Sequence, residues 1–103
     1  MTTEQKLDFI AAKVSLESRL MQVAEEAAEL IQAASKRIRI EVGDNPTAIT
    51  KDEAINNLVE EIADVNNAIA ALRFDDVLPP GIVEVLQREK IDRWYKRIRG
   101  EKK

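Results

Sequence analysis

Two short acidic segments carry carboxylates at a spacing that suits metal binding. The segments read Glu25-Glu26-Ala27-Ala28-Glu29-Leu30 and Glu60-Glu61-Ile62-Ala63-Asp64-Val65. Each contains an i, i+3 pair, Glu26 with Glu29 and Glu61 with Asp64, and such side chains are neighbours about 5–6 Å apart at Cβ on a helix. Two carboxylates at that distance can share one hard cation or bridge two, and they repel one another when no cation is present.

The position of these acids relative to the apolar faces bears on their role. Acidic i, i+3 pairs are common on solvated helices, so spacing alone leaves that interpretation open. Glu26 and Glu61, however, lie beside the apolar arcs of their helices. If the two helices pack along those arcs, all four acids converge on one partly dehydrated pocket. Oxygen-only ligands favour Mg²⁺, with Mn²⁺ as a second candidate.

Missing residue types narrow the chemistry further. The chain of 103 residues has no cysteine and no histidine, which excludes disulfides, thiol catalysis, imidazole bases and the Glu-x-x-His motifs of di-iron bundles. The net charge of −3 argues against a nucleic acid polymer as a partner. No apolar run approaches the roughly 18 residues of a membrane span, so we expect no membrane partner and a cytoplasmic location.

Glycine and proline positions divide the chain into helical segments. They cluster around residues 43–46 and 79–81, and between these breaks the apolar residues recur every three or four positions. Four helices and no strand therefore predict a single all-α domain over residues 1–103. We expect a short first helix, a long helix from Ser15 to Gly43, a third opened by the capping box Thr50-Lys51-Asp52-Glu53 and ending before Asp75, and a last helix over 82–99.

Apolar side chains mark the faces that the two long helices bury. On the second helix they fall within one arc of about 100°, which describes an amphipathic helix. Helices this long bury only part of their apolar area in so short a chain, so we expect assembly into helical bundles as a homodimer or homotetramer. The residues expected in these faces are Leu16, Leu20, Val23, Ala27, Leu30, Ile31, Ala34 and Ile38, and on the third helix Ile55, Leu58, Ile62, Val65, Ile69 and Leu72.

The end of the chain carries the opposite charge to the rest. Residues 1–80 have 8 basic and 15 acidic side chains, whereas residues 81–103 have 8 basic and 4 acidic ones. Lys90, Arg93 and Arg97 share one helical face and are candidates to hold phosphate oxygens, although a solvated basic stripe is the alternative. Trp94 lies in the apolar register, which favours packing in a core or an interface.

Asn57 lies one turn before Glu61 and is a candidate for substrate binding or for orienting that carboxylate.

Taken together, these motifs resemble the all-α nucleoside triphosphate pyrophosphatases of the MazG-like group. The two acidic segments match the metal-binding segments of that group, and Lys90-Ile91-Asp92-Arg93-Trp94-Tyr95-Lys96-Arg97 is similar to its basic C-terminal segment. The resemblance spans residues 5–99. It implies hydrolysis of a nucleoside triphosphate to the monophosphate and pyrophosphate. It also implies that Glu26, Glu29, Glu61 and Asp64 are the catalytic residues that hold Mg²⁺.

Two classes of function follow from these observations. The first is a Mg²⁺-dependent nucleoside triphosphate pyrophosphohydrolase that acts on ribo- or deoxyribonucleotides in nucleotide-pool housekeeping. The second is a non-enzymatic helical dimerisation or regulatory module that binds a partner, which needs only the amphipathic helices and treats the acids as solvated. Glu25, Glu60 or one of the metal ligands is a candidate general base. The sequence leaves the preferred base and sugar and the number of metal ions open.

Overall fold

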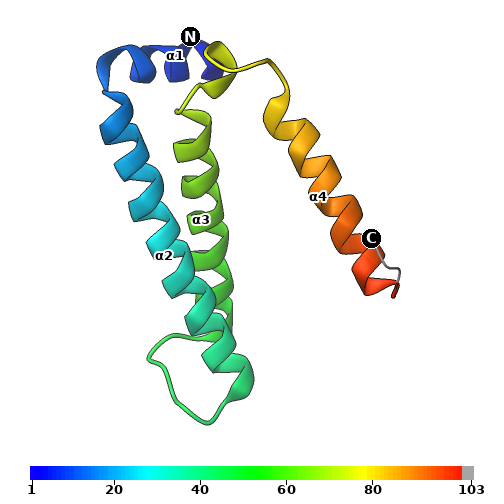
Figure 1. Ribbon diagram of the computed structural model, residues 1–103. Helices are drawn as coiled ribbons and strands as arrows, with labels where there is room; N and C mark the ends of the chain where they lie inside the picture. The colour runs from blue at the N-terminus through cyan, green and yellow to red at the C-terminus, as the bar shows by residue number, and fades with distance from the viewer. Residues whose placement is uncertain (101–103) are drawn as a thin grey trace. The chain divides into compact units, whose positions relative to one another are not determined.

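The computed structural model describes residues 1–100, and its secondary structure in that range consists of helices joined by loops, with no strand (Figure 1). Its elements are α1 (Thr3–Lys13), α2 (Leu16–Val42), α3 (Lys51–Ala70), the short 3₁₀ helix η1 (Phe74–Asp76) and α4 (Ile82–Ile98). The predicted all-α class and the four predicted helices are confirmed. The chain divides into a first unit, Met1–Arg73, and a second unit that begins at Phe74.

Local side-chain chemistry sets the ends of the long helices. The Ser15 hydroxyl accepts a hydrogen bond from the Ser18 N–H at the start of α2, and Gly43 ends that helix in the left-handed conformation at φ 80°. Left-handed backbone suits glycine because it has no Cβ to clash. At the start of α3, the Thr50 hydroxyl and the Glu53 carboxylate each accept the other residue's backbone N–H, at 3.1 and 3.0 Å. The predicted caps are therefore confirmed.

Helices α2 and α3 lie side by side as an antiparallel pair and form the main contact between helices of the first unit (Figure 1). Only three alanines are buried in that unit, Ala33, Ala54 and Ala68. Small side chains at the line of closest approach let the two backbones come together. The core of the first unit, taken by itself, is consequently very small.

Many of the large apolar side chains in the predicted faces are exposed in the first unit. Ile31 is 66% exposed and Ile38 is 63% exposed on α2, and Ile69 is 50% exposed on α3. A lone pair of helices touches along one narrow stripe, so large residues at the flanks of each apolar arc have no second partner to cover them. The exposed members of the predicted faces are Leu16, Leu20, Ile31, Ile38, Ile55, Ile62 and Ile69.

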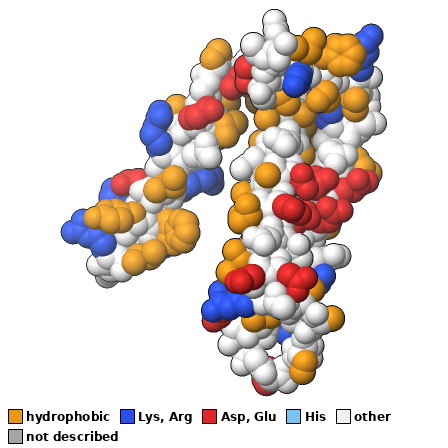
Figure 2. All heavy atoms as spheres, turned by 180° about the vertical axis from the view of Figure 1, so that it is seen from behind, with side chains coloured by type: hydrophobic (Ala, Val, Ile, Leu, Met, Phe, Trp, Pro, Cys, Tyr) orange, Lys and Arg blue, Asp and Glu red, His pale blue; other side chains and the backbone are white. Residues whose placement is uncertain are grey.

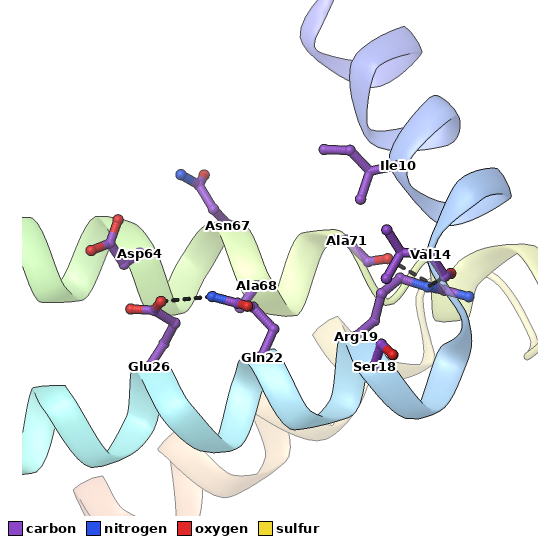
Figure 3. A pocket seen from close by; sticks show the side chains of 10 residues that line it. All are labelled: Ile10, Val14, Ser18, Arg19, Gln22, Glu26, Asp64, Asn67, Ala68 and Ala71. Carbon is purple, nitrogen blue, oxygen red and sulfur yellow. Dashed lines mark hydrogen bonds between the residues drawn. The ribbon is translucent and has the colours of Figure 1, made fainter.

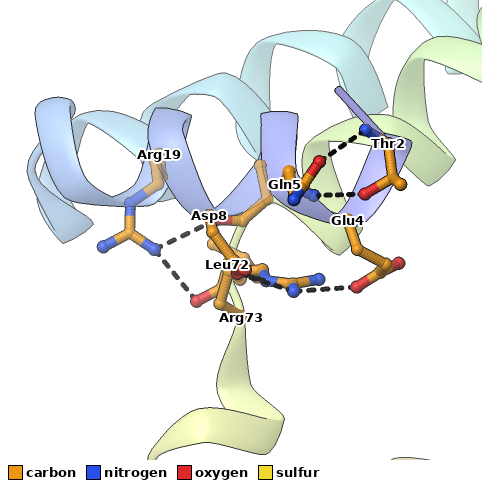
Figure 4. A network of polar contacts seen from close by, with 8 residues as sticks. Thr2, Glu4, Gln5, Asp8, Arg19, Leu72 and Arg73 are labelled. Atoms are coloured by element: carbon orange, nitrogen blue, oxygen red, sulfur yellow. Dashed lines mark hydrogen bonds and ion pairs between the residues drawn. The ribbon is translucent and has the colours of Figure 1, made fainter.

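Two arginines tie α1 to the end of α3 (Figure 4). The Arg19 guanidinium donates to the backbone carbonyls of Val14, Ala71 and Leu72 at 2.9–3.0 Å, which satisfies carbonyls left free where α3 ends. Arg73 adopts a left-handed backbone at φ 54° and forms ion pairs with Glu4 and Asp8 of α1. These polar contacts fix α1 across the end of the α2–α3 pair.

The second unit consists of η1, a proline-containing turn and α4. Gly81 precedes α4 in the left-handed conformation at φ 79°, and no residue of α4 is buried. Trp94 is 60% exposed on α4, and its packing in a core or an interface stays a prediction. No helix in residues 1–100 is long and apolar enough to cross a membrane.

Candidate metal centre

Four carboxylates from two helices meet midway along the α2–α3 pair. Glu26 and Glu29 of α2 and Glu61 and Asp64 of α3 each offer one oxygen, and these four oxygens lie within 4.8 Å of one another. Acidic side chains form a continuous patch on that part of the first unit (Figure 2). The predicted convergence therefore follows from two features, the i, i+3 spacing on each helix and the antiparallel register that sets one pair against the other.

Two of the four carboxylates have an oxygen that is buried and has no partner. Glu26 and Glu61 are half-buried, and the Oε2 atom of each has no hydrogen bond within the described residues. A buried acceptor without a donor costs roughly 1–3 kcal/mol, more when the group is charged. A positively charged group between the helices could satisfy both atoms.

The electrostatics of Glu26 agree with that interpretation. Burial raises the pKa of the Glu26 carboxyl, and the neighbouring charges of Glu29 and Asp64 raise it further. The Gln22 amide opposes this shift because its Nε2 donates to Glu26 Oε1 at 2.7 Å. Ionised carboxylates this close repel one another, so the arrangement is least stable in the absence of a cation.

The donor set fits a hard divalent cation. All four groups are carboxylates, and Mg²⁺ binds oxygen ligands at about 2.0–2.1 Å, which places opposite ligands about 4 Å apart. The observed spread of 4.8 Å needs side-chain movements of less than about 1 Å to reach that spacing. The four residues could therefore hold a metal ion together.

A hollow lies beside the carboxylates on the side of α1; we call it the α1 hollow (Figure 3). Its volume is about 400 Å³, at the small end of the roughly 300–1,000 Å³ typical of small-molecule sites. Glu26 and Asp64 form one end of it. The rest of the wall comes from Ile10, Val14, Ser18, Arg19, Gln22, Asn67, Ala68 and Ala71.

A second hollow, of about 340 Å³, lies on the other side of the carboxylates; we call it the Lys36 hollow. Glu29 and Glu61 border it, and Asn57 lines it, so the structure places that predicted residue beside the acids. Gln32, Ala33 and Lys36 complete its wall.

Sequence reasoning missed three of the polar residues in these hollows. Lys36 lies seven residues after Glu29, Gln22 four residues before Glu26, and Asn67 three residues after Asp64. Each spacing keeps a side chain on the same helical face as the acid. The signal that identifies all three is a polar side chain one or two turns from a carboxylate on the same helical face.

The predicted phosphate-binding residues belong to the second unit. Lys90, Arg93 and Arg97 line a shared hollow of about 360 Å³ on α4, together with Ile91 and Trp94. The predicted common face is thus confirmed. Comparisons of the whole chain with family models, curated proteins and solved structures find no match.

Proposed function

We propose that this protein is a Mg²⁺-dependent nucleoside triphosphate pyrophosphohydrolase. The observation that carries the proposal is the convergence of Glu26, Glu29, Glu61 and Asp64, with buried and unpartnered oxygens on Glu26 and Glu61. A nucleoside triphosphate is a polyanion and cannot bind an acidic pocket unaided. Divalent cations between the carboxylates and the triphosphate neutralise the repulsion between these negative charges. A substrate that binds together with metal ions therefore accounts for four carboxylates at one place.

The chain's own residues have separable tasks in this reaction. The four carboxylates would hold Mg²⁺, which supplies charge neutralisation at the phosphoryl oxygens and lowers the pKa of a bound water. Gln22 fixes one oxygen of Glu26 through its hydrogen bond. This contact leaves the other Glu26 oxygen, which has no partner within the described residues, available as a ligand.

The chemistry requires one base and one leaving group. Water adds to the α-phosphorus, the bond to the bridging oxygen of the β-phosphate breaks, and the products are a nucleoside monophosphate and pyrophosphate. A carboxylate takes the proton of the water. Glu25 and Glu60 are candidates because each directly precedes a proposed ligand and is exposed to solvent.

Resemblance to the MazG-like group supports this reaction over other metal chemistry. The two acidic segments and the basic segment of residues 90–97 occur in the order that the group shows. The absence of histidine argues against a di-iron carboxylate bundle, which uses Glu-x-x-His motifs. Lys90, Arg93 and Arg97 are proposed to hold phosphate oxygens, because a basic face with a hollow suits an anion.

Assembly of several copies is part of the proposal. The first unit buries three alanines and leaves large aliphatic side chains exposed along α2 and α3. Burying apolar surface is worth roughly 25 cal/mol per Å², so a second copy that covers these faces gains substantial free energy. A homodimer or homotetramer built from packed helix pairs would supply the core that one chain lacks.

A direct assay tests the enzymatic proposal. A panel of ribo- and deoxyribonucleoside triphosphates is incubated with the protein and Mg²⁺, and the release of pyrophosphate is measured against that of orthophosphate. We expect pyrophosphate and a nucleoside monophosphate. Orthophosphate as the product would contradict the proposed bond cleavage.

The exposed apolar faces also favour the second candidate, a helical dimerisation or regulatory module without enzymatic activity. Thermal melting with and without millimolar Mg²⁺ separates the two. A metal centre binds the folded state and raises the midpoint, because the cation relieves repulsion among the carboxylates. A plain bundle should respond no more to Mg²⁺ than to an increase of ionic strength with sodium chloride.

A further inference from the structure

The two hollows beside the metal centre lie in opposite directions along the same helix pair. Because α2 and α3 are antiparallel, residues 18–22 of α2 and residues 67–71 at the C-terminal end of α3 lie at the α1 end. Residues 32–36 of α2 and Asn57 of α3 lie toward the connection between the two helices. A ligand centred on the carboxylates can therefore extend both ways, and the chemistry of each hollow decides which end lies where.

The α1 hollow suits a neutral and partly apolar group. Aliphatic side chains of α1 and the alanines of α3 form part of its wall, and the amides of Gln22 and Asn67 add hydrogen-bonding capacity without charge (Figure 3). The one cation there, Arg19, already donates to three backbone carbonyls. A flat ring with apolar faces and a polar edge matches these walls, whereas a phosphate chain would find no available positive charge.

The Lys36 hollow has the opposite character. Lys36 forms no ion pair within residues 1–100, although Glu29 and Glu61 line the same hollow. It lies two helical turns beyond Glu29, about 10 Å along the axis. The positive charge of a lysine beside the carboxylates opposes the binding of a cation there. A ligand that Lys36 binds must therefore be an anion. Asn57 adds an amide donor on the facing helix.

We propose that Lys36 binds the terminal phosphates of the substrate, so that the nucleoside lies in the α1 hollow and the reacting phosphate lies over the four carboxylates. This inference rests on the proposed function and adds the orientation in which the substrate lies along the helix pair. It makes Lys36 a substrate-binding residue of the first unit. It also makes Asn67 a residue that contacts the nucleoside rather than the phosphates.

The first experiment uses inorganic tripolyphosphate, which has the phosphates of the substrate but no nucleoside. Its competitive inhibition is measured in the presence of Mg²⁺ for the wild type and for Lys36→Gln, Lys36→Arg and the control Lys51→Gln. Lys51 is a lysine of the same unit that pairs with Glu41 and lines neither hollow. We expect Lys36→Gln to weaken inhibition by about tenfold or more, Lys36→Arg to restore most of it, and Lys51→Gln to change it less than twofold.

A Mg²⁺ titration followed by thermal melting excludes an indirect effect through the metal. Removing a positive charge beside the carboxylates should leave Mg²⁺ affinity unchanged or increase it. Weaker inhibition by tripolyphosphate together with weaker Mg²⁺ binding would therefore overturn a direct role for Lys36. Inhibition of Lys36→Gln within twofold of the wild type would overturn it as well.

Asn67→Leu supplies the complementary measurement at the other hollow. We expect this variant to change the relative kcat/KM values among nucleoside triphosphates with different bases and to leave inhibition by tripolyphosphate unchanged. If Lys36→Gln alters base preference and Asn67→Leu alters tripolyphosphate binding, the substrate lies in the reverse direction and the inference is wrong. If the wild-type protein releases pyrophosphate from none of the nucleotides, this result contradicts the proposed function itself.

Discussion

The α2–α3 pair and α4 carry opposite charges, and they differ in what surrounds their charged side chains. On the pair, carboxylates from two helices meet, and two of their oxygens are buried without a partner. On α4, Lys90, Arg93 and Arg97 line a hollow made by their own helix, and no residue of α4 is buried. The acidic cluster forms only because two helices pack together, whereas the basic face is formed by α4 alone.

This difference shows when helical spacing alone predicts a site. An i, i+3 pair fixes two side chains relative to each other, but a site also needs a second element at a known register. For α2 and α3, the caps at Ser15 and Thr50 and the left-handed Gly43 set where each helix begins or ends. The short connection then makes the two helices antiparallel neighbours. For α4 no comparable feature specifies a partner.

The largest effect is expected at the carboxylates. Glu26→Gln or Asp64→Asn should abolish turnover at saturating Mg²⁺, because amide oxygens are poorer ligands for this cation. Repulsion within the cluster falls, so the metal-free melting midpoint should hold or rise while circular dichroism stays helical. Glu17→Gln, at an exposed position in the first turn of α2, is the matched control. Wild-type activity in either cluster variant would exclude the proposed ligand role.

A smaller effect is expected on the basic face. Lys90→Ala or Arg93→Ala should lower kcat/KM by about ten- to a hundredfold, the equivalent of roughly 1.5–3 kcal/mol for a charge-assisted contact to phosphate. Mg²⁺ binding should not change. Arg88→Ala is the control on the same helix, since Arg88 is not among the residues that line the α4 hollow. Kinetic constants within twofold of the wild type for both variants would mean that the face is only solvated.

The sequence predicted the elements and the acidic cluster well, because both depend on local chemistry. Capping side chains, helix-breaking residues and i, i+3 geometry act over a few positions. The register of the two capped helices then brings the two carboxylate pairs together. Ile31 and Ile38 lie in the predicted apolar face of α2 and are well exposed. Amphipathicity shows which face of a helix is expected to be buried, but not whether the same chain or another copy covers that face. Lys36 was missed although it lies on the carboxylate face of α2, because its environment depends on Asn57 and Glu61, which the facing helix brings into the same hollow.

Assembly gives the next prediction in order of size. At micromolar concentration, light scattering should show a dimer or tetramer. Ile38→Glu should raise the dissociation constant by about tenfold or more, since burying one such side chain is worth roughly 1.5–3 kcal/mol. Met21→Glu, which changes an exposed apolar residue of α2 outside the predicted apolar face, is the control. An active and stable monomer would show that the exposed aliphatic faces of α2 and α3 do not need a second copy.

The smallest effect concerns pH and separates two kinds of glutamate. The pKa of Glu53 lies below its ordinary value of 4.5 because the Thr50 N–H donates to its carboxylate, so this group stabilises the fold above that pH and loses the contribution as the pH falls. The pKa of Glu26 is raised from the same ordinary value, chiefly by burial and then by Glu29 and Asp64. In metal-free protein the folded state therefore binds the Glu26 proton more tightly than the unfolded state.

The stability contribution of Glu26 should consequently be greatest below its unfolded-state pKa and decline as the pH rises through the raised value. We expect the melting midpoint of Glu26→Gln, relative to that of the wild type, to increase across this pH range in the presence of a chelator. Millimolar Mg²⁺ should reverse the difference at neutral pH, because it binds the ionised wild-type cluster better than the variant. Glu53→Gln should show the opposite dependence, with its deficit growing as the pH rises toward 4.5 and staying constant above that pH. Parallel curves for the two variants would mean that Glu26 is an ordinary surface carboxylate.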